Sequence, residues 1–184
     1  MGGLASRGQL RMSFLRWAIV TVPAILLLGF VAGVSVARRE EAIWYLALRK
    51  PWITPPAWVF PVAWTALYIL MGLSLAMILH ARGAKGRGAA VMLFGVQLAF
   101  NLAWTPLFFG AHQVWLALLD IAAMLAFAIA ATVAFARIRR PAAWLMVPYL
   151  VWISFAGVLT WRIGQLNPDA ANLAPRASTT QVIG

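Results

Sequence analysis

The residues of this 184-residue chain best suited to bind or transform a ligand are its 10 tryptophans. An indole ring offers a large flat apolar face and one N–H donor, so a group of such rings can stack on an aromatic ligand. Most of these tryptophans fall near the ends of apolar segments, where an interfacial belt explains them. Trp64, Trp104 and Trp152 fall deeper, and a belt does not account for them.

Each of these deep tryptophans shares a predicted helical face with other residues at spacings of three or four positions. Turned inward together, the faces would form an aromatic pocket with few hydrogen-bonding groups, which suits a flat apolar ligand such as a tetrapyrrole or a sterol. The alternative is helix packing with the amides as interhelical hydrogen bonds, and the residues alone slightly favour it. The faces comprise Trp64 and Tyr68; Gln97, Asn101, Trp104 and Phe108; and Tyr149, Trp152 and Ala156.

Conventional catalytic and metal sites have few candidate residues. The chain has no Cys, 2 His and 4 acidic residues, which excludes disulfides and thiol chemistry and leaves little for a metal or an acid/base pair. Asp120 falls inside an apolar segment, where a carboxylate is costly, and we favour a structural role over a functional one. His80 and His112 fall in predicted loops, so we expect both to be solvated and neither to be a haem ligand.

The composition indicates that these residues belong to segments embedded in a membrane. The chain is 64% hydrophobic and 10% charged, with a mean hydropathy of +0.86, whereas an average soluble domain is about a quarter charged. The net charge of +11 could suggest nucleic acid, but the basic residues cluster between long apolar runs, as in the loops of membrane proteins. We therefore expect the lipid bilayer as a partner and no nucleic acid.

Five apolar segments approach the length of about 20 residues that crosses a bilayer as a helix. The sequence predicts an all-α membrane protein, a five-transmembrane-helix bundle at 17–163 with a structured first loop. A cytoplasmic segment, 1–16, precedes it and a flexible C-terminal tail, 164–184, follows. A cleaved signal peptide is the less favoured alternative for the first segment, because its apolar run exceeds the usual h-region. The helices are expected at about 17–37, 59–79, 89–109, 114–135 and 142–163.

The distribution of charge predicts the orientation. With five helices, the N-terminus shares a side with the second and fourth loops, and that side holds nine basic residues against six on the other. The positive-inside rule therefore places the N-terminus in the cytoplasm. Helical rather than strand-like spans favour a bacterial inner membrane.

The first predicted loop, residues 38–58, is far longer than the other connections and is rich in Trp and Pro. Trp44, Tyr45 and Leu48 lie at helical spacing and predict a short interfacial helix that ends at Pro51. A connection of about 20 residues is usually functional or disordered. Two interpretations remain open, a rigid aromatic lid over a cavity and an aromatic belt at the headgroups, and spacing alone favours the belt.

Small residues at every fourth position predict two faces for close helix approach. One face is Gly29 and Gly33 in the first helix, and the other is Gly95, Ala99 and Ala103 in the third. We expect one face to pack within the bundle and the other between the subunits of a dimer, and the sequence does not say which.

Four ordered motifs resemble the tryptophan-rich sensory protein / translocator protein family, the family of the peripheral-type benzodiazepine receptor. The resemblance covers about residues 23–167, nearly all of the membrane part. The motifs are WYxxLxKPxxxPPxW at 44–58, WxxLY at 64–68, QLxxNxxWxxxFFG at 97–110 and PYxxWxxFA at 148–156.

The resemblance implies a five-helix bundle, commonly homodimeric, whose pocket is closed by the first loop. It implies that this pocket binds porphyrins and haem, and in some members sterols and benzodiazepine-type drugs. Relatives in photosynthetic bacteria act as oxygen-linked negative regulators of pigment-synthesis genes, and light-dependent breakdown of protoporphyrin has been proposed for bacterial members. Mapped by motif, the pocket residues would be Trp52, Trp64, Asn101, Trp104, Trp152, Ala156 and Leu159.

The chain departs from the family pattern in three places, and two of these departures bear on the ligand. The sterol-associated pattern needs a Tyr followed by a basic residue near the end of the last helix, where this chain has Trp161 and Arg162, which argues against sterol binding. The basic residue of the animal first loop is replaced by Ala57, which argues against typical drug affinity. The usual Leu-Asn of the last helix is Leu159-Thr160.

We therefore expect a tetrapyrrole-binding membrane protein of sensory or regulatory type, with porphyrin or haem as ligand and no obligatory cofactor or metal. One alternative is a light-dependent porphyrin-degrading enzyme with Trp52 and Trp152 as candidate reactive side chains. The other is a tetrapyrrole or sterol transporter, against which the lack of internal repeats argues. Propionates could pair with basic residues of the first loop, namely Arg38, Arg39, Arg49 or Lys50.

Overall fold

The computed structural model describes residues 7–37 and 39–173, and within these residues every regular element is a helix. Five of the helices are long and apolar enough to cross a membrane, so the all-α five-helix fold is confirmed. The long helices are α1 Arg7–Val34, α3 Val59–His80, α4 Arg87–Thr105, α5 Val114–Ile138 and α6 Arg140–Leu166. The short ones are α2 Arg39–Ala47, the π-helix η1 Pro106–Gly110 and the 3₁₀-helix η2 Ala170–Leu173.

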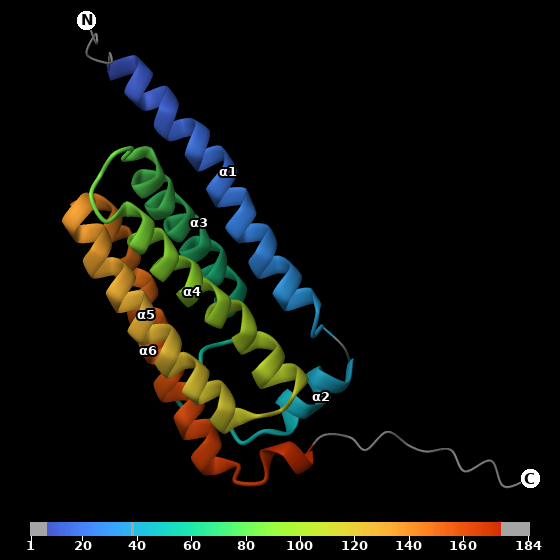
Figure 1. Ribbon diagram of the computed structural model, residues 1–184. Coiled ribbons are helices and arrows are strands. Elements are labelled where there is room, and N and C mark those ends of the chain that lie inside the picture. The colour runs from blue at the N-terminus through green and yellow to red at the C-terminus, as the bar shows by residue number, and fades with distance from the viewer. Residues whose placement is uncertain (1–6, 38, 174–184) are drawn as a thin grey trace, which may run out of the picture.

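Four of the long helices, α3, α4, α5 and α6, surround one core, and α1 lies outside them against α3 (Figure 1). The most extensive contacts join α1 to α3, α3 to α6, α6 to α5 and α5 to α4. The core is built of apolar side chains that are almost fully buried, among them Met71, Phe94, Met124, Phe135 and Met146. The large apolar side chains on the outer faces are exposed, as lipid-facing helices require.

Close backbone approach holds α1 on α3. The Thr21 hydroxyl donates to the Gly72 carbonyl oxygen at 2.7 Å. A Cβ at Gly72 would lie 2.7 Å from the Cα of Val22, and one at Gly29 would overlap the ring of Tyr68. The glycine face of the first helix therefore packs within the bundle at Gly29, while Gly33 has open space beside it.

The first loop is ordered and folds over one end of the bundle, which we call the lid end. Helix α2 forms where the aromatic spacing predicted a short helix, and Pro51 follows it. A turn closed by the Thr54 N–H and hydroxyl, which both donate to the Pro51 carbonyl oxygen, then leads toward α3. Trp44 is fully buried here, so the belt interpretation is wrong for this residue. We call residues 39–58 the lid.

Two expected boundaries differ in the structure. Helix α1 starts at Arg7, ten residues before the expected position 17, because the basic segment has no Pro and its one Gly, Gly8, falls in the first turn of the helix. The expected flexible tail begins too early, since α6 runs to Leu166 and η2 follows with Ala170 buried. The part of the expected tail at 174–184 lies outside the described residues.

Candidate functional site

A cavity of about 360 Å³ lies at the lid end of the bundle, between α3, α4, α5 and α6. Tyr45 and Ala57 contribute to its wall from the lid. Helices α3 and α4 contribute Phe60, Trp64, Trp104 and Thr105, and η1 contributes Phe108 and Phe109. The other residues of the wall come from α5 and α6: Ile121, Met124, Trp152, Ile153, Phe155, Ala156, Leu159, Thr160 and Ile163.

The aromatic rings of the wall form two groups with different geometry. Trp64 and Trp152 lie edge to face, with ring centroids 6.5 Å apart and an interplanar angle of 85°. Trp104 and Phe108 are stacked nearly parallel, at 5.1 Å and 13°. The wall therefore contains indole rings in two orientations.

The π-helix η1 explains how two phenylalanines of one segment reach the cavity. Pro106 lacks an N–H and cannot continue the regular α-helical ladder. The helix instead continues as a wider π-helical turn, in which the Ala111 N–H donates to the Pro106 carbonyl oxygen, five residues back, at 2.8 Å. Such π-turns often occur at functional sites. Here the turn lets both Phe108 and Phe109 face the cavity.

Few polar groups line the cavity. The Trp104 Nε1 is buried and has no hydrogen-bond partner within the described part of the chain. Thr105 and Thr160 add hydroxyls to the wall. The Trp104 N–H is therefore an unsatisfied buried donor, which is costly.

A hydrogen-bond network ties three of the helices together in the bundle core. The Tyr68 hydroxyl donates to Asn101 Oδ1 at 2.9 Å. Asn101 Nδ2 donates to the Tyr149 hydroxyl at 3.3 Å, and that hydroxyl donates to Gln97 Oε1 at 2.7 Å. Gln97 and Asn101 are thus interhelical hydrogen-bonding residues, as the packing interpretation predicted.

The structure brings five of the seven predicted pocket residues to the cavity wall: Trp64, Trp104, Trp152, Ala156 and Leu159. Asn101 does not line the cavity and belongs to the network just described. Trp52 is 93% exposed and also lies outside the wall. On geometry, the partner of Trp152 is Trp64 rather than Trp52.

Sequence reasoning missed several wall residues. Phe60 precedes Trp64 by one helical turn, so the period of the helix could have found it, as it found Phe108 on the face of Trp104. Tyr45 reaches the cavity through the fold of the lid, and no local pattern indicates this.

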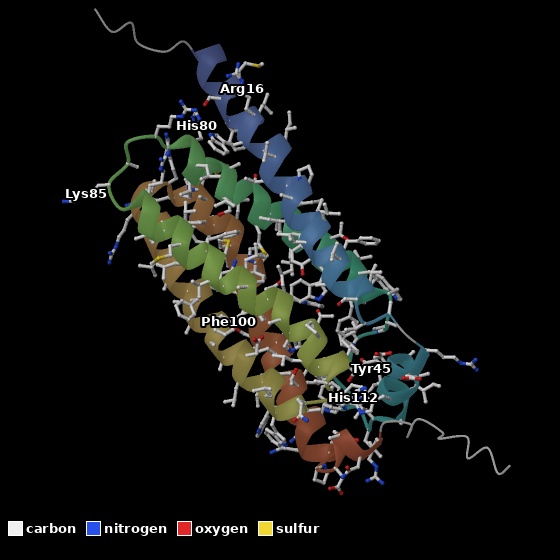
Figure 2. The ribbon with its side chains drawn as sticks, turned by 45° about the vertical axis from the view of Figure 1, so that its right-hand side comes forward. Arg16, Tyr45, His80, Lys85, Phe100 and His112 are labelled. Atoms are coloured by element: carbon white, nitrogen blue, oxygen red, sulfur yellow. The ribbon has the colours of Figure 1, made fainter. Side chains whose placement is uncertain are left out.

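A cationic side chain lies beside the lid part of the wall. Lys50 Nζ is 4.5 Å from the ring centroid of Tyr45, within the range of a cation–π contact. Partial burial lowers the pKa of Lys50 below its ordinary 10.5, and burial raises the pKa of the Tyr45 hydroxyl above its ordinary 10.0. Figure 2 shows Tyr45 at the same end of the molecule as His112.

The other ionisable residues lie outside the cavity wall. His112 is half-buried, with its ring 4.4 Å from that of Trp44, so the expectation that it is solvated is wrong. His80, at the opposite end, is half-buried too, and its Nδ1 lies 3.1 Å from the Ser13 hydroxyl. Asp120 is buried without a partner for Oδ2 in the described chain. Across residues 7–37 and 39–173, no group of three His, Asp or Glu could hold a metal ion.

Comparison with known proteins places similar sequences over the same region. The model of the TspO/MBR family matches residues 19–166. The chain is 42% identical over 144 residues to a tryptophan-rich protein TspO of Chlorobaculum tepidum, covering 78% of this chain and 90% of that protein. It is 42% identical over 147 residues to a tryptophan-rich sensory protein of Cereibacter sphaeroides, with coverages of 77% and 91%. The translocator protein of Bos taurus is 40% identical over 142 residues, with coverages of 76% and 84%.

Proposed function

Because the chain belongs to the TspO/MBR family, we propose that it is a membrane sensor or regulator that binds a tetrapyrrole, porphyrin or haem, in the aromatic cavity. The relatives carry the names of a sensory protein and of a translocator protein, which agree with a ligand-binding role in a membrane. The chain is an integral membrane protein of five spanning helices.

The observation that carries the proposal is a single cavity wall that contains all three deep tryptophans. Its volume of about 360 Å³ falls within the range of about 300–1,000 Å³ of small-molecule sites. A planar macrocycle would gain about 0.5–1.5 kcal/mol from each ring on which it stacks, beyond the apolar area that it buries.

The polar groups at the lid suit the acidic edge of a porphyrin. Lys50, beside Tyr45, can pair with a propionate. Arg39 and Arg49 are exposed at the same end and are further candidates. Arg38 lies outside the described residues. The macrocycle would then be inside the apolar cavity with its carboxylates at the lid.

The membrane orientation is part of the proposal. The side chains described at the end opposite the lid include seven basic and no acidic residues, whereas the lid end mixes both signs. The positive-inside rule therefore supports a cytoplasmic N-terminus, in the inner membrane of a bacterium. The basic residues are Arg16, Arg82, Lys85, Arg87, Arg137, Arg139 and Arg140.

We also propose a homodimer that uses the small-residue face of α4. Gly95 has nothing within 4 Å of a Cβ placed on it, and Ala99 on the same face is exposed. Such faces let a second helix approach closely within a membrane.

Quenching of tryptophan fluorescence by protoporphyrin tests the proposed site. Titration of the purified protein should quench its fluorescence, and Trp104→Ala or Trp152→Ala should weaken binding by about tenfold or more, because each loses a stacking surface of the wall. Trp144→Ala is the matched control, since Trp144 is also on α6 but is 71% exposed and does not line the cavity. Equal affinity in the wall variants and in this control would refute the site.

The edge-to-face pair of Trp64 and Trp152 favours a second candidate, light-dependent degradation of the bound porphyrin. Illumination of the complex in air distinguishes it from simple binding. Porphyrin absorbance that falls with the wild type and persists with Trp64→Phe/Trp152→Phe indicates an enzyme, provided that the variant still binds. Equal loss in both, or no loss, leaves binding alone.

A further inference from the structure

The lid is joined to the C-terminal end of the bundle by one asparagine. Asn167 Oδ1 accepts a hydrogen bond from the Arg49 N–H at 2.8 Å. Its Nδ2 donates to the Arg49 carbonyl oxygen at 2.9 Å and to the Ile163 carbonyl oxygen at 2.8 Å. A single amide side chain thus holds both backbone polar groups of Arg49 and anchors them to the last turn of α6.

A second hydrogen bond from the lid ends on Ala170, in the 3₁₀ turn η2 that follows α6. Trp44 Nε1 donates to the Ala170 carbonyl oxygen at 2.8 Å. The Trp44 side chain is fully buried, and its ring packs edge-on against Phe108 with centroids 5.4 Å apart. Leu48 and Ile163 are buried in the same apolar cluster. The C-terminal turn is therefore packed against α2 as well as hydrogen-bonded to it.

These bonds are the long-range hydrogen bonds of the lid. In the part of the chain that the structure describes, the hydrogen bonds that join residues 39–58 to another part of the chain end on Asn167 or Ala170, apart from those at the start of α3, where the Val59 N–H donates to the Pro56 carbonyl oxygen. The other hydrogen bonds of the lid are internal, such as those from Thr54 to Pro51. Tyr45, the neighbour of Trp44, lines the cavity. The contact that fixes α2 thus also fixes the cavity wall.

We propose that Asn167 and Ala170 form a latch for the lid, so that the C-terminal turn sets how readily the lid opens over the cavity. Asn167 acts as a positioning residue, because it reaches the cavity only through Arg49 and α2. Release of the latch frees α2 to move away with Tyr45 and leaves the deep tryptophans in place. The consequence for ligand exchange rests on the function proposed above, whereas the mechanical statement about the lid does not.

Hydrogen exchange of the ligand-free protein in detergent or nanodiscs tests the mechanical statement. In Asn167→Ala the amides of residues 39–58 should exchange about tenfold faster, because two hydrogen bonds to the lid are lost. Trp44→Phe keeps an aromatic ring but loses the bond to Ala170, and should accelerate the same amides. Gln165→Ala is the matched control, because this nearby amide side chain is exposed and bonds only Arg162.

The pattern of exchange decides the proposal. Acceleration confined to the lid in both latch variants, with α3 and α5 unchanged, supports a latch. Unchanged lid exchange in both variants overturns it. Acceleration spread evenly over the bundle also overturns it, because Asn167 would then stabilise the whole fold.

Stopped-flow binding of protoporphyrin tests the consequence for exchange. The association and dissociation rates should both rise several-fold in Asn167→Ala, while the equilibrium affinity changes less, because the wall tryptophans are untouched. Rates equal to those of the wild type, despite faster lid exchange, would overturn control of ligand exchange by the latch. If the wild type itself fails to bind protoporphyrin, the proposed function fails, and hydrogen exchange still decides the latch.

Discussion

At the scale of single residues, the position of each tryptophan decides what it can do. Trp64, Trp104 and Trp152 share a cavity wall. Trp44 is buried and bonds the lid to the C-terminal turn, whereas Trp52 is 93% exposed. The same type of side chain thus lines a cavity, anchors packing and lies exposed in one small chain, as its apolar ring and single N–H allow.

Lys50 provides a prediction about pH. In the proposed complex its charged form would pair with a propionate, so affinity for protoporphyrin should be highest below the pKa of Lys50 and fall as pH rises through it. Burial lowers that pKa below 10.5, so the loss should begin at lower pH than for an exposed lysine. The fall should be at most about fivefold, since half-exposed ion pairs contribute about 0.2–1 kcal/mol.

Binding titrations across this pH range check the prediction with two controls. Lys50→Arg keeps the charge at high pH and should remove the fall. Protoporphyrin dimethyl ester has no free propionate, so its affinity should not depend on the charge of Lys50. A fall that persists in both controls would assign the pH dependence to another group.

The sequence predicted that Trp64, Trp104 and Trp152 are deep and share a pocket. Each lies away from both ends of its apolar segment, and helical periodicity indicates which residues share its face. It did not predict the burial of Trp44, which results from contact with Ala170, 126 positions later. It also placed Trp52 in the pocket by motif, whereas the turn after Pro51 leaves its ring exposed. Local spacing carries no information about such long-range contacts, and they determine most of the lid.

At the scale of the elements, helix composition predicted the five spans, since each must cover about 30 Å of hydrocarbon. The structure of the connections was less predictable. Helix α2 was expected, but its bonds to the C-terminal turn were not, and that turn was expected to be flexible. The π-turn of η1 was likewise not expected, although Pro106 is the local cause.

The contact between α1 and α3 gives a prediction for two matched glycines. Gly29→Ala should lower stability by about 1–3 kcal/mol, because its methyl group would overlap the Tyr68 ring and disturb the bond to Asn101. Gly33→Ala, one turn further along α1, has open space and should be neutral or stabilising.

Unfolding midpoints in the same detergent compare the two variants directly. A Gly29→Ala midpoint equal to that of Gly33→Ala would show that α1 is not packed against Tyr68 in this way. The comparison uses one helix and one type of substitution, so helix propensity does not explain a difference.

At the scale of the whole molecule, the two ends of the bundle differ in charge and in structure. At the end opposite the lid the described charged side chains are all basic, and Figure 2 shows Arg16, His80 and Lys85 there. The lid end holds the cavity, the lid and the latch. Family membership agrees with this architecture. Composition predicted the bundle and its charge bias, whereas the cavity depends on how four helices and the lid meet.

The central claim is that the cavity at the lid end is the tetrapyrrole site, and filling it tests that claim most directly. Ala156 is a small residue of the cavity wall, so Ala156→Trp places a large ring in the space that the macrocycle would use. Val151→Trp is the control, because Val151 is on the same helix and is 65% exposed on the outer face.

The measurement is the dissociation constant of protoporphyrin for the three folded proteins, each checked by its unfolding midpoint. We predict an affinity at least about tenfold weaker for Ala156→Trp, a loss of about 1.4 kcal/mol or more, and an unchanged affinity for Val151→Trp. A folded Ala156→Trp protein that binds protoporphyrin as tightly as the wild type would contradict the account.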